Sequence, residues 1–123
     1  MDNGQSKENV LKEKSYGFAL RIVRLYKHLC ERNKEYVLSK QILRSGTSIG
    51  ANIAEANQAQ SKPDFVHKLS ISLKEAVETE YWLNLLNDAD YLTDSQFESL
   101  IGDCRELIRI LTSSIKTAKG GKK

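Results

Sequence analysis

Few residues of this 123-residue chain have both the type and the spacing that a reaction requires. The two histidines are His28 and His67, and neither follows a glutamate by three positions, as the di-iron sites of helical bundles require. Asp64 does precede His67 by three, but an acidic residue there also suits the positive end of a helix. We therefore expect no metal site and no cofactor.

Other catalytic arrangements are also missing from the sequence. Glu78 and Glu80 are two positions apart, so on a helix they point about 200° from each other and do not make a general acid–base pair. The glycine-containing stretch lacks the Gly-x-x-x-x-Gly-Lys pattern of a phosphate-binding loop. We predict that the protein is not an enzyme.

Basic side chains remain as candidates, because they can bind phosphate groups. The chain has 19 basic and 16 acidic residues, a formal net charge of +3, and the charge is uneven. Residues 61–90 are acidic, whereas residues 1–35 and 91–123 are basic, so the first and last helices could share a basic stripe. An ordinary solvated face is the alternative. The candidate phosphate contacts are Arg21, Arg24, Lys27, Arg44, Arg105 and Arg109.

Polar residues on the side expected to be buried form a second group of candidates. A buried carboxylate or amide must be paired, so we expect hydrogen bonds across helices or across a subunit boundary. A network that fixes the register of the helices explains these residues better than catalysis does. The predicted buried polar network consists of Asn52, Glu55, Glu75, Glu78, Glu80 and Trp82.

Helices must position all of these residues. Apolar residues recur at steps of three and four, and the chain has a single proline, Pro63. The pattern predicts an all-α fold, an antiparallel up-down-up-down four-helix bundle over residues 9–118. We place its helices at about 9–31, 35–58, 62–88 and 93–117, with flexible ends at 1–8 and 119–123.

Two of the predicted helices have clear start signals. Ser61 or Lys62 is expected at the cap of the third helix, because Pro63 is tolerated only in the first turn. Thr93 and Gln96 have the spacing of a capping box for the fourth helix.

The centre of the second helix, residues 45–51, is rich in small residues and could be read as a loop. Each glycine costs about 1 kcal/mol relative to alanine in a helix interior, so a kink near Gly46 is the alternative. Because the apolar period continues through the stretch, we predict an unbroken helix whose small residues allow close packing or oligomer contact. That face comprises Ser45, Gly46, Ile49, Gly50 and Ala54.

The cysteines and the ends of the chain bear on its location. Cys30 and Cys104 lie among apolar residues at helical spacing, so we expect two reduced core thiols. The first fifteen residues lack the apolar core of a signal peptide, and no apolar run approaches the length of a membrane span. We expect a soluble, cytoplasmic protein with no membrane partner.

Two motifs of the chain resemble those of a known family. Residues 41–56, followed by Gln60-Ser61-Lys62 and Asp64-Phe65, resemble the signature of the bacterial four-helix-bundle proteins encoded by intervening sequences in 23S rRNA genes. That family is related to the accessory variability determinant of diversity-generating retroelements. Residues 73–83 resemble the third-helix signature of one branch. The resemblance covers about residues 15–117.

The resemblance implies a ring-like homopentamer with a nucleic-acid-binding role, and it identifies no catalytic residue. We therefore expect a non-enzymatic homo-oligomer that binds RNA or DNA through a basic surface, with a nucleic-acid enzyme such as a reverse transcriptase as a further partner. The alternative is a protein-interaction scaffold or accessory subunit that makes no direct contact with nucleic acid.

Overall fold

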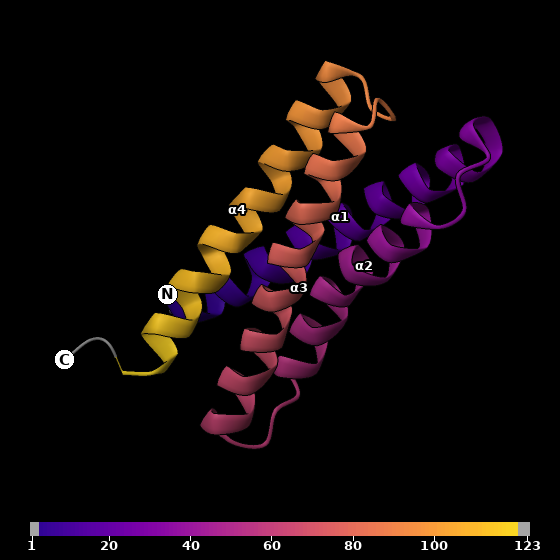
Figure 1. Ribbon diagram of the computed structural model, residues 1–123. Helices are drawn as coiled ribbons and strands as arrows, with labels where there is room; N and C mark the ends of the chain where they lie inside the picture. Colours follow the sequence, from indigo (N-terminus) through magenta and orange to yellow (C-terminus); the bar gives the residue numbers. More distant parts are fainter. Residues whose placement is uncertain (1–2, 121–123) are drawn as a thin grey trace.

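The computed structural model describes the backbone of residues 3–120 and the side chains of residues 9–120. The described chain folds into four α-helices with no strand among them (Figure 1). They are α1 (Asn3–Asn33), α2 (Leu38–Ala56), α3 (Lys62–Asp88) and α4 (Asp94–Ala118). The all-α prediction is confirmed.

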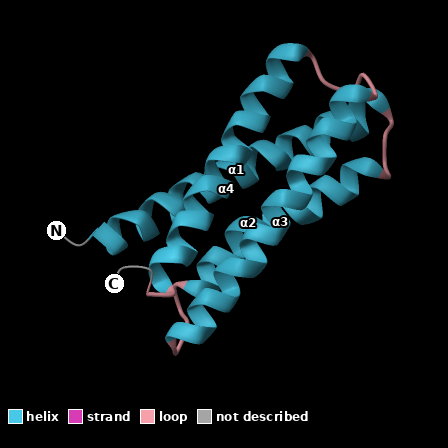
Figure 2. Ribbon diagram, turned by 60° about the vertical axis from the view of Figure 1, so that its left-hand side comes forward, coloured by secondary structure: helices cyan, strands magenta, loops and turns pink. Residues whose placement is uncertain are grey.

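The helices form a bundle in which each packs against two neighbours. Contacts join α1 to α2, α2 to α3, α3 to α4, and α1 to α4. Short connections make consecutive helices run in opposite directions, with turns at both ends of the bundle (Figure 2). The fold is thus the predicted four-helix bundle.

The helix bounds differ from the prediction mainly at the first two helices. α1 begins at Asn3 rather than at residue 9, because no proline interrupts the polar residues that precede the apolar pattern. The predicted flexible segment 1–8 is therefore helical from Asn3, and residues 1–2 lie outside the described residues. At the other end, α4 finishes at Ala118, and residues 121–123 of the predicted flexible terminus also lie outside the description.

α2 begins at Leu38 rather than at residue 35, because Glu35 caps the helix from outside it. The Glu35 carboxylate accepts hydrogen bonds from the backbone N–H groups of Val37 at 3.2 Å, Leu38 at 3.0 Å and Ser39 at 2.7 Å. Burial alone would raise the pKa of Glu35, but these donors outweigh it and hold the pKa below its usual value. The negative charge of Glu35 is therefore bound to the start of α2.

The start signals of α3 and α4 are confirmed. The Ser61 hydroxyl accepts a 3.2 Å hydrogen bond from the Asp64 backbone N–H, with Pro63 in the first turn. Thr93 and Gln96 form both bonds of a capping box, at 2.9 and 3.1 Å. These caps satisfy backbone donors that a helix start leaves unpaired.

The core consists of the apolar stripes of the four helices. In α1 the stripe runs through Phe18, Ile22, Leu25 and Leu29, all buried. α2 continues unbroken through residues 45–51, so the predicted rod is confirmed and the kink near Gly46 is not observed. Burial of these side chains supplies the free energy that offsets the poor helix propensity of two glycines.

Candidate functional site

The small-residue face of α2 lies directly against α1. A Cβ atom added to Gly46 would come within 2.8 and 2.9 Å of the two γ-carbons of Ile22. At Gly50 the corresponding distances are 3.3 Å to the Ser15 Oγ and 3.4 Å to the Ser15 carbonyl oxygen. These glycines therefore let two helix backbones approach closely, which is the close-packing role that the sequence predicts for them.

The other residues of the predicted face divide between the core and the surface. Ser45 and Ile49 are fully buried, whereas Ala54 is exposed. Ala54 borders a groove of about 640 Å³ between the first half of α1 and the second half of α2. The groove has small residues on its walls, among them Gly17, Ala19, Gly50 and Ala51. The face thus serves internal packing at one edge and forms an open apolar surface at the other.

Among residues 9–120, hydroxyl and thiol groups form the fully buried side-chain hydrogen bonds. The hydroxyls of Thr79 and Ser45 lie 2.8 Å apart, between α3 and α2. The Ser72 hydroxyl donates to the Ile49 carbonyl oxygen at 2.8 Å across the same interface. Small polar residues at core positions of α2 and α3 are the sequence signal for this network, which was not among the predicted polar contacts.

Cys104 adds a third buried polar contact, because its thiol donates to the Ala76 carbonyl oxygen at 3.3 Å. Burial raises the pKa of this thiol to about 12, so it is protonated and unsuited to nucleophilic chemistry. Cys30 is half-buried and lies 3.7 Å from the Ser39 hydroxyl. Both cysteines are free, as predicted.

The prediction that the side chains of the polar network are buried is wrong. Glu55 is exposed, and the other members are only half-buried, because these positions lie at the rims of the helix contacts. Glu55 pairs with Lys68 at 2.7 Å, and the Asn52 side-chain amide donates to the Ser48 carbonyl oxygen of its own helix at 2.9 Å. At a rim, long polar side chains reach both a partner and water.

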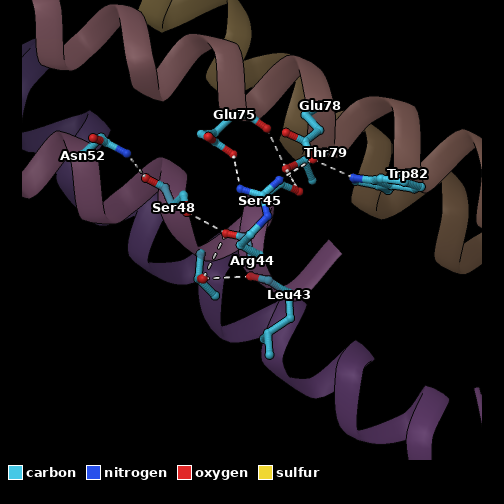
Figure 3. Close-up of polar contacts among 10 residues, drawn as sticks. Leu43, Arg44, Ser45, Ser48, Asn52, Glu75, Glu78, Thr79 and Trp82 are labelled. Carbon is cyan, nitrogen blue, oxygen red and sulfur yellow. Dashed lines mark hydrogen bonds and ion pairs between the residues drawn. The ribbon is translucent and has the colours of Figure 1, made fainter. Parts of the chain in front are cut away.

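Arg44 joins α2 to the carboxylates of α3 (Figure 3). Its guanidinium donates to Glu75 at 3.3 Å and forms an ion pair with Glu78. The Trp82 indole N–H donates to the same Glu78 carboxylate at 3.0 Å. The hydrogen bonds from Trp82 and Arg44 lower the pKa of Glu78, and the bond to Glu78 raises the pKa of Arg44. Arg44 is exposed, but its guanidinium is paired with two carboxylates of α3 rather than free to bind phosphate.

Two further candidate phosphate contacts are paired across helices. Arg21 of α1 forms an ion pair with Asp103 of α4 at 2.7 Å. Arg105 of α4 pairs instead with Glu80 of α3, at 2.8 Å. Asp103 and Arg105 are two positions apart and so point about 200° from each other on α4. The single basic stripe expected along α1 and α4 therefore does not form, although the two helices are neighbours.

The remaining candidates, Arg24, Lys27 and Arg109, are exposed. No ion pair joins any of these three to a carboxylate within residues 9–120. Arg109 lies one turn beyond Arg105 on α4, away from the other two. Only Arg24 and Lys27, three positions apart on α1, are therefore both unpaired and close together.

Arg24 and Lys27 belong to a segment that concentrates positive charge, which we name the cationic end. It comprises residues 21–44, the second half of α1, the turn and the start of α2, and it holds seven basic and two acidic side chains. One of those acidic side chains is Glu35, whose carboxylate is occupied by backbone donors. The rest of the chain has twelve basic and fourteen acidic residues. Counted along the sequence, the net positive charge of the protein thus comes from residues 21–44, although Arg21 and Arg44 of this segment are paired with carboxylates of other helices.

A shallow groove of about 260 Å³ lies between α1 and α4, and residues of the cationic end form its α1 side. Arg21, Arg24 and His28 line it from α1, and Gln96 and Leu100 line it from α4. Such a groove offers nitrogen donors to an anion and gives that anion access from solvent.

The described residues contain neither a cluster of metal-binding side chains nor a membrane-spanning helix. No group of three or more histidine, cysteine, aspartate or glutamate side chains is gathered there as metal ligands would be. None of the four helices, over their described lengths, combines the length and apolar character needed to cross a membrane.

The fold is that of the antiparallel four-helix-bundle proteins. Comparison with known proteins identifies the family. The model of the 23S rRNA-intervening sequence protein family matches residues 7–113, so the chain belongs to that family. A crystal structure from Bacteroides thetaiotaomicron, described as a protein of unknown function from the S23 ribosomal protein family, is 61% identical. The match covers 89% of this chain and 98% of that one, with a TM-score of 0.88. Comparison with curated proteins gave no match.

Proposed function

We propose that this protein is a non-enzymatic, cytoplasmic homo-oligomer that binds RNA or DNA through its cationic end. The observation that carries the proposal is the concentration of seven basic side chains in residues 21–44, with Arg24 and Lys27 unpaired. An unpaired surface cation can bind a phosphate without first losing a carboxylate partner, and the counterions it releases from the nucleic acid favour binding.

The proposed oligomer uses the apolar surface of α1 and α2. Tyr16 is 68% exposed, and Leu20 and Val23 follow it on the same outward face of α1. Tyr16 also lines the groove of about 640 Å³ that Ala54 borders. A contiguous exposed apolar surface of this kind marks an interaction site. The family resemblance of the sequence supports a pentamer as the assembly.

Charge reversal on α1 tests the nucleic-acid role. We expect R24E/K27E to abolish most binding of a fluorescent oligonucleotide, measured by anisotropy at low salt. The matched control is K62E/K116E, which changes the net charge equally but alters exposed lysines outside the cationic end. If each lost contact releases about 0.7 counterion from a single strand, the reversal should lower the slope of log affinity against log salt by about 1.4. Equal losses in both variants would refute a localised site.

Light scattering tests the proposed assembly. The unaltered protein should have a mass several times its 13.9 kDa chain, and five times for a pentamer. Tyr16→Glu should reduce that mass, because it places a charge in the apolar surface of α1. A monomer at all concentrations would contradict the oligomer.

The same apolar surface favours a second candidate function, an accessory subunit that docks a partner protein such as a reverse transcriptase. Under this alternative the partner, not nucleic acid, covers the groove beside Tyr16. R24E/K27E then leaves capture of the partner intact, whereas Tyr16→Glu abolishes it. The two variants therefore separate the two functions.

A further inference from the structure

The turn between α1 and α2 holds an exposed aromatic residue within the cationic end. Tyr36 is 52% exposed and Val37 is 70% exposed, although both are large and apolar. Basic side chains precede and follow them in sequence, with Arg32 and Lys34 on one side and Lys40 on the other. An aromatic ring among cations is the arrangement by which proteins bind unstacked bases and the phosphates that connect them.

Hydrogen bonds hold the backbone of the turn that carries Tyr36. The backbone N–H of Glu35 donates to the Leu29 carbonyl oxygen of α1 at 3.0 Å, while the Glu35 carboxylate accepts from the first N–H groups of α2. Lys34 has a φ of 55°, the left-handed conformation that ends α1. Because the backbone beside Tyr36 is anchored, the turn does not have to become ordered when a ligand binds.

We propose that the cationic end takes a single-stranded nucleic acid, with one unstacked base resting on the Tyr36 ring. The proposal rests on the function proposed above and names its ligand class. In a duplex the bases are stacked on one another and cannot reach a protein ring unless one is flipped out, so Tyr36 discriminates against the duplex form. Under this proposal the phosphates on either side of the bound base are contacted by the basic residues that flank Tyr36 in the sequence, Arg32, Lys34 and Lys40.

The charge balance of the turn agrees with this ligand. Glu35 is the acidic residue of the turn, and its carboxylate faces the N-terminus of α2. Lys34 donates to the Glu31 backbone carbonyl oxygen at 3.1 Å, and no ion pair joins Lys34 to a carboxylate within residues 9–120. A phosphate beside Tyr36 therefore meets cations and a carboxylate that is already bound.

The test is the affinity for three probes, a single-stranded thymidine oligomer of about 20 nucleotides, its uridine RNA counterpart and the DNA duplex. Tyr36→Ala should weaken binding of a single strand by about five- to a hundredfold, the range found when one stacking ring is removed. Tyr36→Phe should keep the affinity, because it keeps the ring. The affinities for the thymidine and uridine oligomers show whether the protein prefers DNA or RNA as its single strand.

The matched control is Tyr81→Ala, because Tyr81 is a 60% exposed tyrosine on α3, outside the cationic end. It should leave the affinity unchanged. The salt slope gives a second readout. Tyr36→Ala should preserve the slope, since the ring carries no charge, whereas R24E/K27E should reduce it.

The outcomes separate this inference from the proposed function. Loss of binding in R24E/K27E with full single-strand affinity in Tyr36→Ala overturns the inference and keeps the function. Equal losses for single strand and duplex in Tyr36→Ala also overturn it, as does a change of mass in light scattering, which would make Tyr36 a subunit contact. An unaltered protein that binds none of the probes overturns both.

Discussion

Replacing Gly46 by alanine should destabilise the protein, although alanine is the better helix former. Alanine removes the propensity cost of glycine, a gain of about 1 kcal/mol in an unhindered helix interior. Here the new Cβ would lie 2.8 and 2.9 Å from the γ-carbons of Ile22, which is fully buried. A β-branched side chain in a helix has essentially one rotamer, so Ile22 cannot turn away and α1 must shift.

The magnitude follows from these two opposing contributions. Forcing extra volume into a packed core costs about 1–3 kcal/mol, so the net loss for Gly46→Ala is about 1 kcal/mol. Gly102→Ala is the matched control, since it lies in the interior of α4 with no atom within 4 Å of the added Cβ. That variant should gain about 0.5–1 kcal/mol. The two alanine variants should therefore differ by about 2 kcal/mol.

The assay is urea unfolding followed by circular dichroism, at one protein concentration because association shifts apparent stability. Combining Gly46→Ala with Ile22→Ala should reverse the sign of the Gly46 substitution, since the two γ-carbons that it meets are gone. If Gly46→Ala stabilised the protein as much as Gly102→Ala does, the close approach of α1 and α2 at Gly46 would be refuted.

Three further predictions concern capping, thiol reactivity and the paired arginine. Glu35→Gln should lower the free energy of unfolding by roughly 1 kcal/mol at pH 7, as loss of a helix cap does. Because the folded pKa of Glu35 is lowered, this stabilisation exists above the unfolded pKa and is lost as pH falls through the folded pKa. Urea unfolding should therefore show a smaller difference between the two proteins at pH 3 than at pH 7. Cys104 should resist thiol reagents at pH 8 in the folded protein and react in urea, which a time course of thiol titration checks. Arg44→Met should lower the free energy of unfolding in urea by about 0.5–1 kcal/mol. It should keep the oligonucleotide affinity, because Arg44 is paired with Glu75 and Glu78. A loss of affinity equal to that of R24E/K27E would contradict this.

The fold was predictable because its signals are local. The apolar period and the caps at Ser61 and Thr93 place α3 and α4 almost to the residue. The start of α2 was not predictable in this way. Glu35 is a helix-forming residue, but its carboxylate caps the helix from outside. A glutamate four positions before a buried serine does not by itself reveal whether the backbone there is helical or turned.

The candidate site was predictable only in part. Whether a basic side chain is free to bind phosphate depends on the carboxylates of the neighbouring helix. Arg21, Arg44 and Arg105 look like Arg24 in the sequence, yet each of the three meets a carboxylate of another helix. Those pairings depend on how far each helix is rotated about its axis. The rotation is set by core contacts such as that between Gly46 and Ile22, which link positions far apart in the chain. Packing of the core thus decides which surface charges remain free, and a variant that shifts α1 against α2 should also alter the charge offered at the cationic end.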